Sequence, residues 1–287
     1  MIENAATSAA DEVFMDLEDA CAPSEKVGAR AIVVEALTAL DFGRKLRVVR
    51  INGVGTRWSH GDVVELVTGA GRELDCLLVP KVESAGHVAF VDHLLTGLEA
   101  ELGLEPRVRL ELLIETAAGI VNVREIAAAS ARTEALVFGP GDYAVDLGVP
   151  RLELGMIDPE YPGHQWHWPM SSIAAHARAA GLQAIDGPYV DFHDREGYLE
   201  AARRARLLGF DGKWCIHPNQ IEWANETFVP SQELYEEAER LLAAYAEASA
   251  AGRGAAVHEG KMIDEATRKL AEKLAEAGRA AKLRMRA

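Results

Sequence analysis

Acidic side chains follow a series of short apolar runs in the sequence. They are Asp16, Glu18, Asp19, Glu115, Asp142 and Asp186, and Arg50 and Lys81 are the basic residues at comparable positions. Carboxylates that gather at one rim of a fold repel each other unless a positive charge lies among them. A hard divalent cation bound by oxygen alone meets this demand, and oxygen ligands favour Mg²⁺ or Mn²⁺ over zinc.

Glu115 and Asp142 are the best pair of candidate metal ligands. Glu115 closes the run Leu112-Leu113-Ile114, and Asp142 follows Val137-Phe138 through the turn Gly139-Pro140-Gly141. If both runs are consecutive strands, their carboxylates project over neighbouring positions of one rim, and Mg²⁺ commonly takes only one or two protein carboxylates. The local alternatives are Glu115 as the N-cap of the next helix and Asp142 as a turn residue.

The two cations have both functional and structural interpretations. Arg50 is suited to holding a substrate carboxylate through two parallel hydrogen bonds, and the alternative is a salt bridge with a rim acid. Lys81 follows Pro80 and either reaches the same pocket or is a solvated loop residue. His217 is favoured as a cap of the final helix of the barrel, whereas the cluster Trp166-His167-Trp168 either lines a pocket or anchors a loop.

Strand-like runs alternate with amphipathic helical stretches along most of the chain. The runs predicted to be strands are Val13–Asp16, Leu46–Asn52, Cys76–Pro80, Arg109–Glu115, Ala135–Gly139, Ala184–Gly187 and Lys213–His217. This alternation is typical of parallel βαβ units in an α/β protein. A TIM (β/α)₈ barrel needs eight strands, so we expect a first strand upstream of Met1. An open doubly wound sheet is the alternative, weakened because no Gly-x-Gly-x-x-Gly turn follows any run.

The helices between the runs begin with one whose predicted N-cap is Ser24 and include Ala117–Ala129. The pattern changes after His217. We predict a barrel catalytic domain over residues 1–230 and a C-terminal helical extension and lid over 231–287, with helices at Ser231–Ala248 and Met262–Arg286. A helix beyond a flexible joint is a candidate lid or swapped arm, and packing on its own barrel is the alternative.

Composition narrows the class of protein. The chain has 287 residues, 49% of them hydrophobic, and a formal net charge of −15 that disfavours generic binding to nucleic acid or to an anionic membrane. Three cysteines, Cys21, Cys76 and Cys215, have no paired spacing and suit a reducing cytosol. The sequence contains no long apolar span and no signal-peptide pattern at its start. We therefore expect a cytoplasmic enzyme.

Several motifs together resemble the citrate lyase β-subunit-like family of CoA-ester lyases, within the wider group of HpcH/HpaI aldolases. They are Phe14-Met15-Asp16-Leu17-Glu18-Asp19-Ala20, Val49-Arg50-Ile51-Asn52, Val79-Pro80-Lys81-Val82-Glu83, Ile114-Glu115-Thr116 and Phe138-Gly139-Pro140-Gly141-Asp142-Tyr143. Later segments look most like the malyl-CoA/β-methylmalyl-CoA lyase branch: Tyr161-Pro162-Gly163-His164-Gln165-Trp166-His167, Asp186-Gly187-Pro188-Tyr189, Gly212-Lys213-Trp214-Cys215-Ile216-His217-Pro218 and Gly260-Lys261-Met262-Ile263-Asp264-Glu265.

The resemblance implies a (β/α)₈ barrel with a C-terminal lid, assembled as a homotrimer or homohexamer. It implies that Glu115 and Asp142 bind Mg²⁺ and that Arg50 contacts the 2-oxo acid and the thioester oxygen. It also implies that Asp264 reaches the site of a neighbouring subunit as the acid/base. Glu18, Asp19 and Lys81 complete the expected substrate-binding set. The family's usual opening segment, of the type Arg-Ser-x-x-x-Val-Pro-Gly and associated with CoA, is absent here.

The expected reaction is therefore reversible cleavage of malyl-CoA or β-methylmalyl-CoA into glyoxylate and acetyl-CoA or propionyl-CoA. The sequence leaves open a malyl-CoA thioesterase, a citramalyl-CoA lyase, an aldolase acting on free pyruvate-like donors, and a non-catalytic lyase subunit. The expected partners are acyl-CoA and 2-oxo acid substrates.

Overall fold

The computed structural model describes residues 2–105, 108–150, 156–252, 255–258 and 260–285. The chain divides into two compact units, residues 1–224 and residues 225–287, which are described separately here. No helix within the described ranges is long and apolar enough to cross a membrane.

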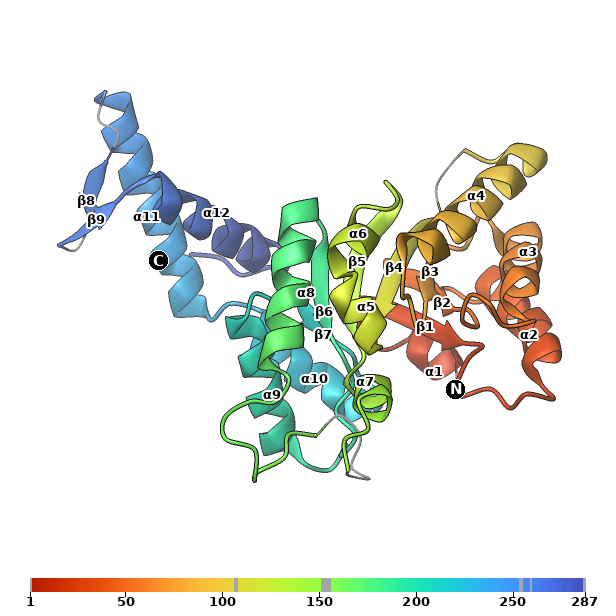
Figure 1. Ribbon diagram of the computed structural model, residues 1–287. Coiled ribbons are helices and arrows are strands. Elements are labelled where there is room, and N and C mark those ends of the chain that lie inside the picture. The colour runs from red at the N-terminus through yellow and green to blue at the C-terminus, as the bar shows by residue number, and fades with distance from the viewer. Residues whose placement is uncertain (1, 106–107, 151–155, 253–254, 259, 286–287) are drawn as a thin grey trace. The chain divides into compact units, whose positions relative to one another are not determined.

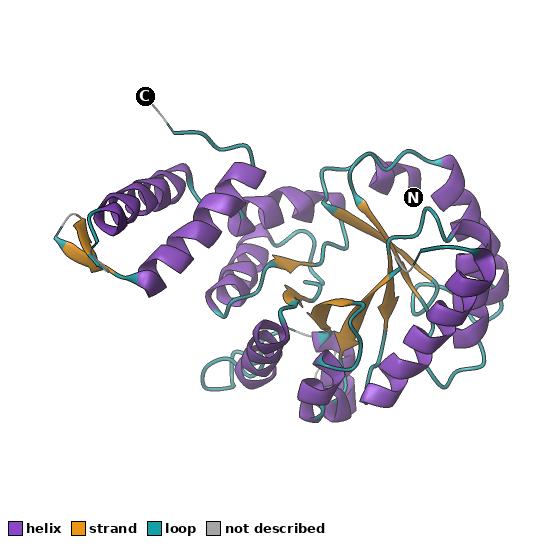
Figure 2. Ribbon diagram, turned by 90° about the horizontal axis from the view of Figure 1, so that it is seen from above, coloured by secondary structure: helices purple, strands orange, loops and turns teal. Residues whose placement is uncertain are grey.

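The first unit is built on one parallel sheet whose strands follow each other in chain order (Figure 1). The strands are β1 (Glu12–Asp16), β2 (Leu46–Arg50), β3 (Cys76–Val79), β4 (Arg109–Ile114), β5 (Thr133–Phe138), β6 (Gln183–Asp186) and β7 (Gly212–Lys213). Every neighbouring pair is parallel. Figure 2 shows this sheet curled, with helices around its outside. This confirms the predicted α/β barrel architecture, with seven strands in the described part of the chain.

Helices connect the strands and cover the outer face of the sheet. They are α1 (Ile2–Ala6), α2 (Lys26–Ala39), α3 (Ser59–Ala70), α4 (Ala85–Leu102), α5 (Ala117–Val121), α6 (Val123–Ala127), α7 (Pro140–Asp146), α8 (His167–Ala180), α9 (Arg195–Leu207) and α10 (Pro218–Phe228). The predicted single helix Ala117–Ala129 is divided at Asn122, whose side-chain amide donates to the Glu83 carbonyl oxygen at 2.9 Å. The predicted cap Ser24 is also wrong, because Glu25 occupies the cap position of α2.

Alternation along the strands separates two environments. Val48, Leu78, Leu113 and Val137 pack together on the inner face of the curled sheet, with Phe14 and Trp214 against them. Successive strand residues point to opposite faces, so Glu111 and Glu115 share the inner face with Leu113, whereas Ile114 points outward to the helices. The last strand is shorter than predicted, and Lys213–His217 contributes only its first residue to β7.

The second unit holds α11 (Gln232–Ala250), a hairpin of β8 (Ala256–His258) and β9 (Lys261–Ile263), and α12 (Glu265–Ala280). The helices pack through Tyr235, Ala238, Ala271 and Ala275. The predicted start of the last helix at Met262 is wrong. Met262 pairs with Val257 in the hairpin, and the helix begins after Asp264, whose carboxylate accepts from the Thr267 amide.

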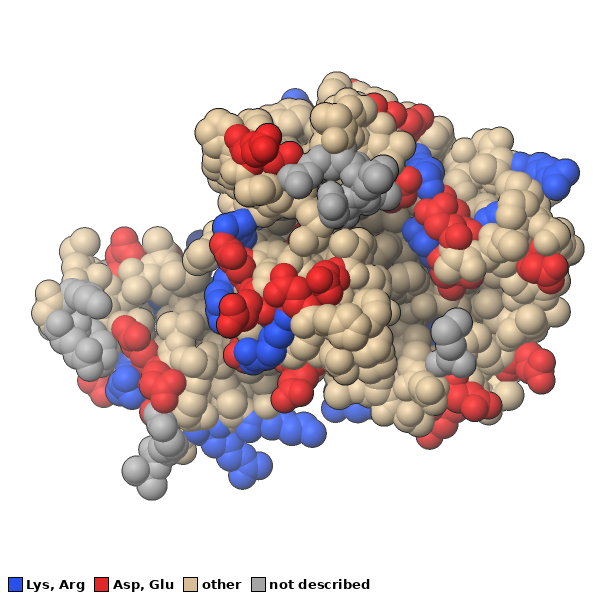
Figure 3. Space-filling model, turned by 90° about the horizontal axis from the view of Figure 1, so that it is seen from below, with Lys and Arg blue, Asp and Glu red and all other residues tan. Residues whose placement is uncertain are grey.

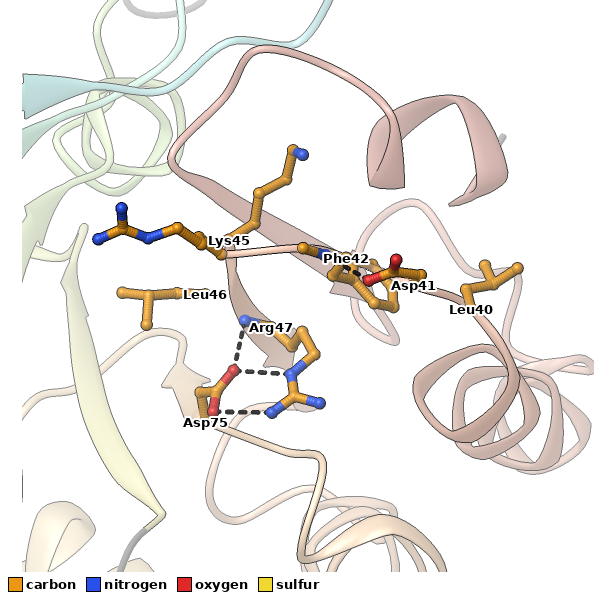
Figure 4. Close-up of a pocket in the computed structure, with 9 residues that line it drawn as sticks. Leu40, Asp41, Phe42, Lys45, Leu46, Arg47 and Asp75 are labelled. Atoms are coloured by element: carbon orange, nitrogen blue, oxygen red, sulfur yellow. Dashed lines mark hydrogen bonds and ion pairs between the residues drawn. The ribbon is translucent and has the colours of Figure 1, made fainter. Parts of the chain in front are cut away.

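A pocket of about 330 Å³ opens at the amino-terminal end of β2. Figure 4 shows that Arg47 turns its guanidinium toward Asp75 across this pocket. Two side-chain hydrogen bonds of 2.8 and 3.0 Å join the residues, and the Arg47 amide donates to the same carboxylate. Because these charges neutralise each other at the end of the strands away from Glu115, we assign the pair to strand positioning.

Asp62 on α3 fixes the segment that follows β2. Its carboxylate is fully buried and accepts from the Asn52 amide at 2.8 Å, from the Asn52 side chain at 2.7 Å and from Arg30 Nε at 2.7 Å. Arg30 also pairs with Glu65, which is half exposed. One buried acid thus holds the chain two residues beyond Arg50.

We expect Asp62→Ala to lower the free energy of unfolding by about 3–5 kcal/mol, because it removes the fully buried partner of the Arg30 guanidinium and leaves the Asn52 amide unpaired. Glu65→Ala is the matched control, since it removes the exposed partner of the same arginine and should cost less than about 1 kcal/mol. Urea denaturation followed by circular dichroism measures both. Equal losses in the two variants would contradict the role given to Asp62.

Glu111 lies on the inner face of β4 and hydrogen-bonds the Glu12 carboxyl group of β1. Burial, followed by the charge and hydrogen bond of Glu12, raises the pKa of Glu111 well above its ordinary value. The folded protein therefore holds a proton that the unfolded chain releases near pH 4.5.

The contribution of Glu111 to the free energy of unfolding should be greatest at acid pH. It should fall as the pH rises from about 4.5 toward the pKa of Glu111 in the folded protein. Glu111→Gln mimics the protonated acid, so it should flatten that part of the stability profile. The midpoint of thermal unfolding, measured at pH values about one unit apart between about pH 5 and pH 8, tests this. If the midpoint of Glu111→Gln changes with pH as steeply as that of the parent protein, Glu111 does not cause the pH dependence.

Candidate active site

The carboxyl ends of β1 to β5 bring most of the predicted site residues together. Asp16 ends β1 and Arg50 ends β2, paired in register. Glu18 and Asp19 lie just beyond β1, Lys81 just beyond β3, Glu115 directly after β4, and Asp142 in the first turn of α7 after β5. In parallel barrels these strand ends meet at one rim. Acidic and basic side chains also lie next to each other on the face shown in Figure 3.

Arg50 is held by the acids that follow β1. Its Nε and Nη2 donate to the two oxygens of Asp16 at 2.8 and 2.5 Å. Its Nη1 lies 3.1 Å from Glu18 Oε2 and 3.6 Å from Asp19 Oδ2. Although burial acts to raise it, this arginine keeps the pKa of Asp16 below its ordinary value. The salt bridge considered from the sequence therefore exists, and Nη1 is the nitrogen that points away from the bidentate pair.

Lys81 links the two halves of the rim. Its Nζ donates to Glu18 Oε1 at 2.6 Å and lies 3.4 Å from Asp19 and 3.7 Å from Asp142. The backbone at Lys81 has a φ of +50°, which is uncommon for a non-glycine residue. Burial acts to lower the pKa of Lys81, but the hydrogen bond to Glu18 raises it, so the side chain is a cation at neutral pH. It is not the solvated loop lysine of the alternative interpretation.

Glu18 is the central acid of this arrangement. Its side chain is only 7% exposed, and it touches both Arg50 and Lys81. Its buried Oε2 makes no hydrogen bond of acceptable geometry, despite the short distance to Arg50. Burial raises the pKa of Glu18 above its ordinary value even beside two cations. The carboxylate therefore has an acceptor oxygen that its neighbours leave incompletely satisfied.

Glu115 is buried, and its Oε1 accepts from the Lys81 amide at 2.9 Å. Burial and then the negative charge of Asp142 raise the pKa of Glu115 well above its ordinary value. Thr116, rather than Glu115, caps the next helix by accepting from the Gly119 amide. The capping alternative for Glu115 is thus wrong, which leaves its carboxylate available to the rim.

Gly139 gives Glu115 its space. A Cβ atom at this position would lie 2.5 Å from both Cβ and Oε2 of Glu115. Any larger residue would therefore displace the carboxylate. The motif Gly139-Pro140-Gly141 contains this requirement, but only the packed strands reveal which neighbour needs the glycine.

The chemistry of these donors fits a hard divalent cation. Glu115 and Asp142 interact as two negative charges, and the Lys81 ammonium, 3.7 Å from Asp142, interacts with both carboxylates. In the described part of the chain, no group of three or more His, Cys, Asp or Glu side chains is placed to hold a metal ion. Two carboxylates are nevertheless what Mg²⁺ commonly takes from a protein, and it completes its shell with water and substrate.

The remaining predicted residues belong to other elements. Asp264 belongs to the second unit, where it is fully exposed and caps α12 through hydrogen bonds of 2.9 Å from the Thr267 amide and hydroxyl. These bonds lower the pKa of Asp264. His217 accepts from the Asn219 amide at the start of α10, as expected of a cap. Trp166 is buried against Phe138 and Tyr143, whereas Trp168 is exposed.

Sequence reasoning missed two groups that support the rim. Lys26 is buried and its ammonium donates to the carbonyl oxygens of Leu17 and Glu18 at 2.9 and 2.6 Å, which fixes the turn that carries Glu18. Trp214 lies against Phe14 and places its ring 6.0 Å from the Arg50 guanidinium carbon. Neither residue has a spacing that points to the site from the sequence alone.

Comparisons with known proteins identify the family of this chain. The family model described as HpcH/HpaI aldolase/citrate lyase matches residues 1–218. An L-malyl-CoA/β-methylmalyl-CoA lyase of Cereibacter sphaeroides is 43% identical over 95% of this chain and 88% of its own. A (3S)-malyl-CoA thioesterase of the same species is 39% identical over 92% of this chain and 85% of its own.

Among solved structures, CitE of Mycobacterium tuberculosis in complex with magnesium, acetoacetate and coenzyme A is 34% identical. It superposes with a TM-score of 0.73 over 96% of this chain and 91% of its own. The sheet order, the rim of charged residues and these similarities lead to one conclusion. The chain belongs to the HpcH/HpaI aldolase/citrate lyase family.

Proposed function

We propose that this protein is a Mg²⁺-dependent carbon–carbon lyase that reversibly cleaves a 3-hydroxyacyl-CoA, malyl-CoA or β-methylmalyl-CoA, into glyoxylate and acetyl-CoA or propionyl-CoA. The observation that carries the proposal is the buried Glu115 carboxylate facing the charge of Asp142 at the rim where Arg50 and Lys81 also lie. The named lyase at 43% identity and the magnesium complex of CitE support the same chemistry.

Glu115 and Asp142 would hold Mg²⁺. When bound, the ion supplies a Lewis acid that chelates a hydroxy or oxo group together with its carboxylate and lowers the hydroxyl pKa. Manganese is a second candidate, because the same oxygen donors suit it. Lys81 holds the Glu115 carboxylate through its amide and lies within 3.7 Å of Asp142, so it positions both ligands.

Arg50 would stabilise the leaving group. Cleavage breaks the C–C bond and leaves the electron pair on the acyl-CoA fragment as a thioester enolate, whose oxyanion needs a fixed positive charge. Asp16 occupies Nε and Nη2, which fixes the plane of the guanidinium. Nη1 is therefore the donor available to the thioester oxygen. The acids Glu18 and Asp19 lie beside this nitrogen and would border the substrate.

Asp264 is proposed as the acid/base that exchanges a proton with the enolate carbon. The lowered pKa of Asp264 leaves the carboxylate ionised at neutral pH, the form that removes a proton from the acyl-CoA methyl group in condensation. We further propose a homotrimer or homohexamer in which this C-terminal segment reaches a neighbouring subunit as a lid, with the assembly in the cytoplasm.

The second candidate is a malyl-CoA thioesterase, favoured by the relative at 39% identity that carries this name. Hydrolysis would use the same rim but deliver water to the thioester carbon. Incubation with malyl-CoA distinguishes the two functions, because a lyase releases glyoxylate and acetyl-CoA, whereas a thioesterase releases malate and free CoA.

Glu115→Gln and Asp142→Asn should each reduce magnesium-dependent turnover by at least about a hundredfold, because each variant removes one anionic metal ligand. The rate of malyl-CoA formation from glyoxylate and acetyl-CoA, together with calorimetric Mn²⁺ binding, measures the loss. Glu83→Gln is the matched control at the same rim and should retain both properties. Turnover that survives in either ligand variant after treatment with a chelator would defeat the metal assignment.

Arg50→Lys should lower kcat by about 10²–10³-fold, because an ammonium cannot hold Asp16 with two bonds and still present a donor to the thioester oxygen. Arg47→Lys on the same strand is the control. Arg47 pairs with Asp75 at the opposite strand end, so this change should leave kcat nearly unaltered. Steady-state kinetics measure kcat, and circular dichroism checks that each variant folds. A kcat in Arg50→Lys equal to that of the parent protein would exclude Arg50 from the reaction.

A further inference from the structure

A second cavity, of about 170 Å³, lies in the first unit, at the carboxyl ends of β5, β6 and β7. Phe138, Asp186 and Lys213 contribute to its wall from β5, β6 and β7, and α9 contributes Arg204. The register pairs Asp186 with Lys213, whereas the preceding Ile185 packs on the inner face of the barrel. Alternation therefore directs Asp186 and Lys213 outward, into the layer between strands and helices.

An ion pair in this layer needs an explanation. Near the carboxyl ends of β4 and β5 the helix-facing residues are apolar and buried, as are Leu112, Ile114 and Leu136. The Asp186 and Lys213 side chains are only 7% and 3% exposed, with Lys213 Nζ 2.5 Å from Asp186 Oδ2. A buried ion pair adds little stability over apolar residues of similar volume. Stability alone therefore does not account for charges at these two positions.

The polar groups around the cavity have more unused donors than acceptors. Lys213 donates two of its three N–H bonds, to Asp186 and to the Gly187 carbonyl oxygen, and its ammonium lies 5.7 Å from the centre of the Tyr198 ring. Both Asp186 oxygens already accept, one from the Gly187 amide and one from Lys213. Arg204 uses one nitrogen for Glu200 on the same helix, and its guanidinium carries five N–H donors in all.

His164 adds an incompletely satisfied group to the same wall. Its Nδ1 is buried without a hydrogen-bond partner, although the whole residue is half-buried. Burial and then the positive charge of Arg204 lower the pKa of His164, so the imidazole is neutral at pH 7. A neutral ring offers one N–H donor. The rest of the wall is largely apolar, with Met156, Ile157, Trp166 and Pro188. It also includes Tyr189 and the Glu200 carboxylate that pairs with Arg204.

We propose that this cavity, which is lined by none of Arg50, Lys81, Glu115 and Asp142, is a binding site for a small carboxylate with a short apolar body. The carboxylate accepts from Lys213, Arg204 and His164, and the apolar part lies against Trp166 and Met156. A cavity that combines apolar walls with a few convergent polar groups is the usual form of a small-molecule site. The proposal does not depend on the lyase reaction, so the two can fail separately.

Butyrate is the probe, titrated into the full chain in the presence of a chelator and followed by saturation-transfer NMR. We expect saturable binding that Arg204→Gln weakens by about tenfold, the loss of one charge-assisted hydrogen bond. Arg204 is 42% exposed, so this variant should fold. Arg203→Gln is the matched control, because it removes the same charge from an exposed position of α9 outside the cavity and should leave the affinity unchanged.

Three results would overturn the proposal. They are the absence of saturable binding, equal affinity in the parent protein and Arg204→Gln, and loss of binding in Arg50→Lys with retention in Arg204→Gln. The last result would place butyrate beside Arg50 instead of in this cavity. Butyramide, which has a similar body and no charge, should bind more weakly than butyrate, and equal binding of the two would also contradict a carboxylate site.

Discussion

The candidate site depends on a series of alternating charges that crosses the ends of five strands, β1 to β5. Asp16 holds Arg50, Arg50 and Lys81 share Glu18, and Lys81 continues to Glu115 through its amide and toward Asp142 through its ammonium. Each charge lies beside one of opposite sign, which allows so many ionised groups to remain at one partly buried rim. Lys81 is the residue that joins Glu18 and Asp19, the proposed substrate-binding acids, to the proposed metal ligands.

At the Glu115 and Asp142 end of this series, the negative charges have too few positive partners. Asp16 and Arg50 satisfy each other through two hydrogen bonds, whereas Glu115 is buried beside a second acid and receives one backbone donor. The excess of negative charge therefore accumulates at Glu115 and Asp142. Glu115 and Asp142 would hold a divalent cation there, and its charge would complete the alternation.

The two faces of the same strands have different tasks. The inner face carries Glu115 in continuation of Leu113, and the outward face carries Asp186 and Lys213 among apolar neighbours. A shift of one residue in strand register would exchange these environments. Supporting groups on helices, such as Lys26 at the turn of Glu18 and Asp62 behind Asn52, fix the segments just beyond the strands. Precise rim geometry thus depends on side chains that take no part in the proposed chemistry.

The sequence by itself determined the α/β class, the order of the strands and most residues of the rim, because short apolar runs ending in charged residues are local patterns. It did not determine that Asp16 takes the bidentate face of Arg50, that Gly139 makes room for Glu115, or that Met262 lies in a hairpin before Asp264. These features join residues from different strands and loops. Their contacts arise only when the packed sheet sets the distance between segments far apart in the chain, so tertiary structure alone decided them.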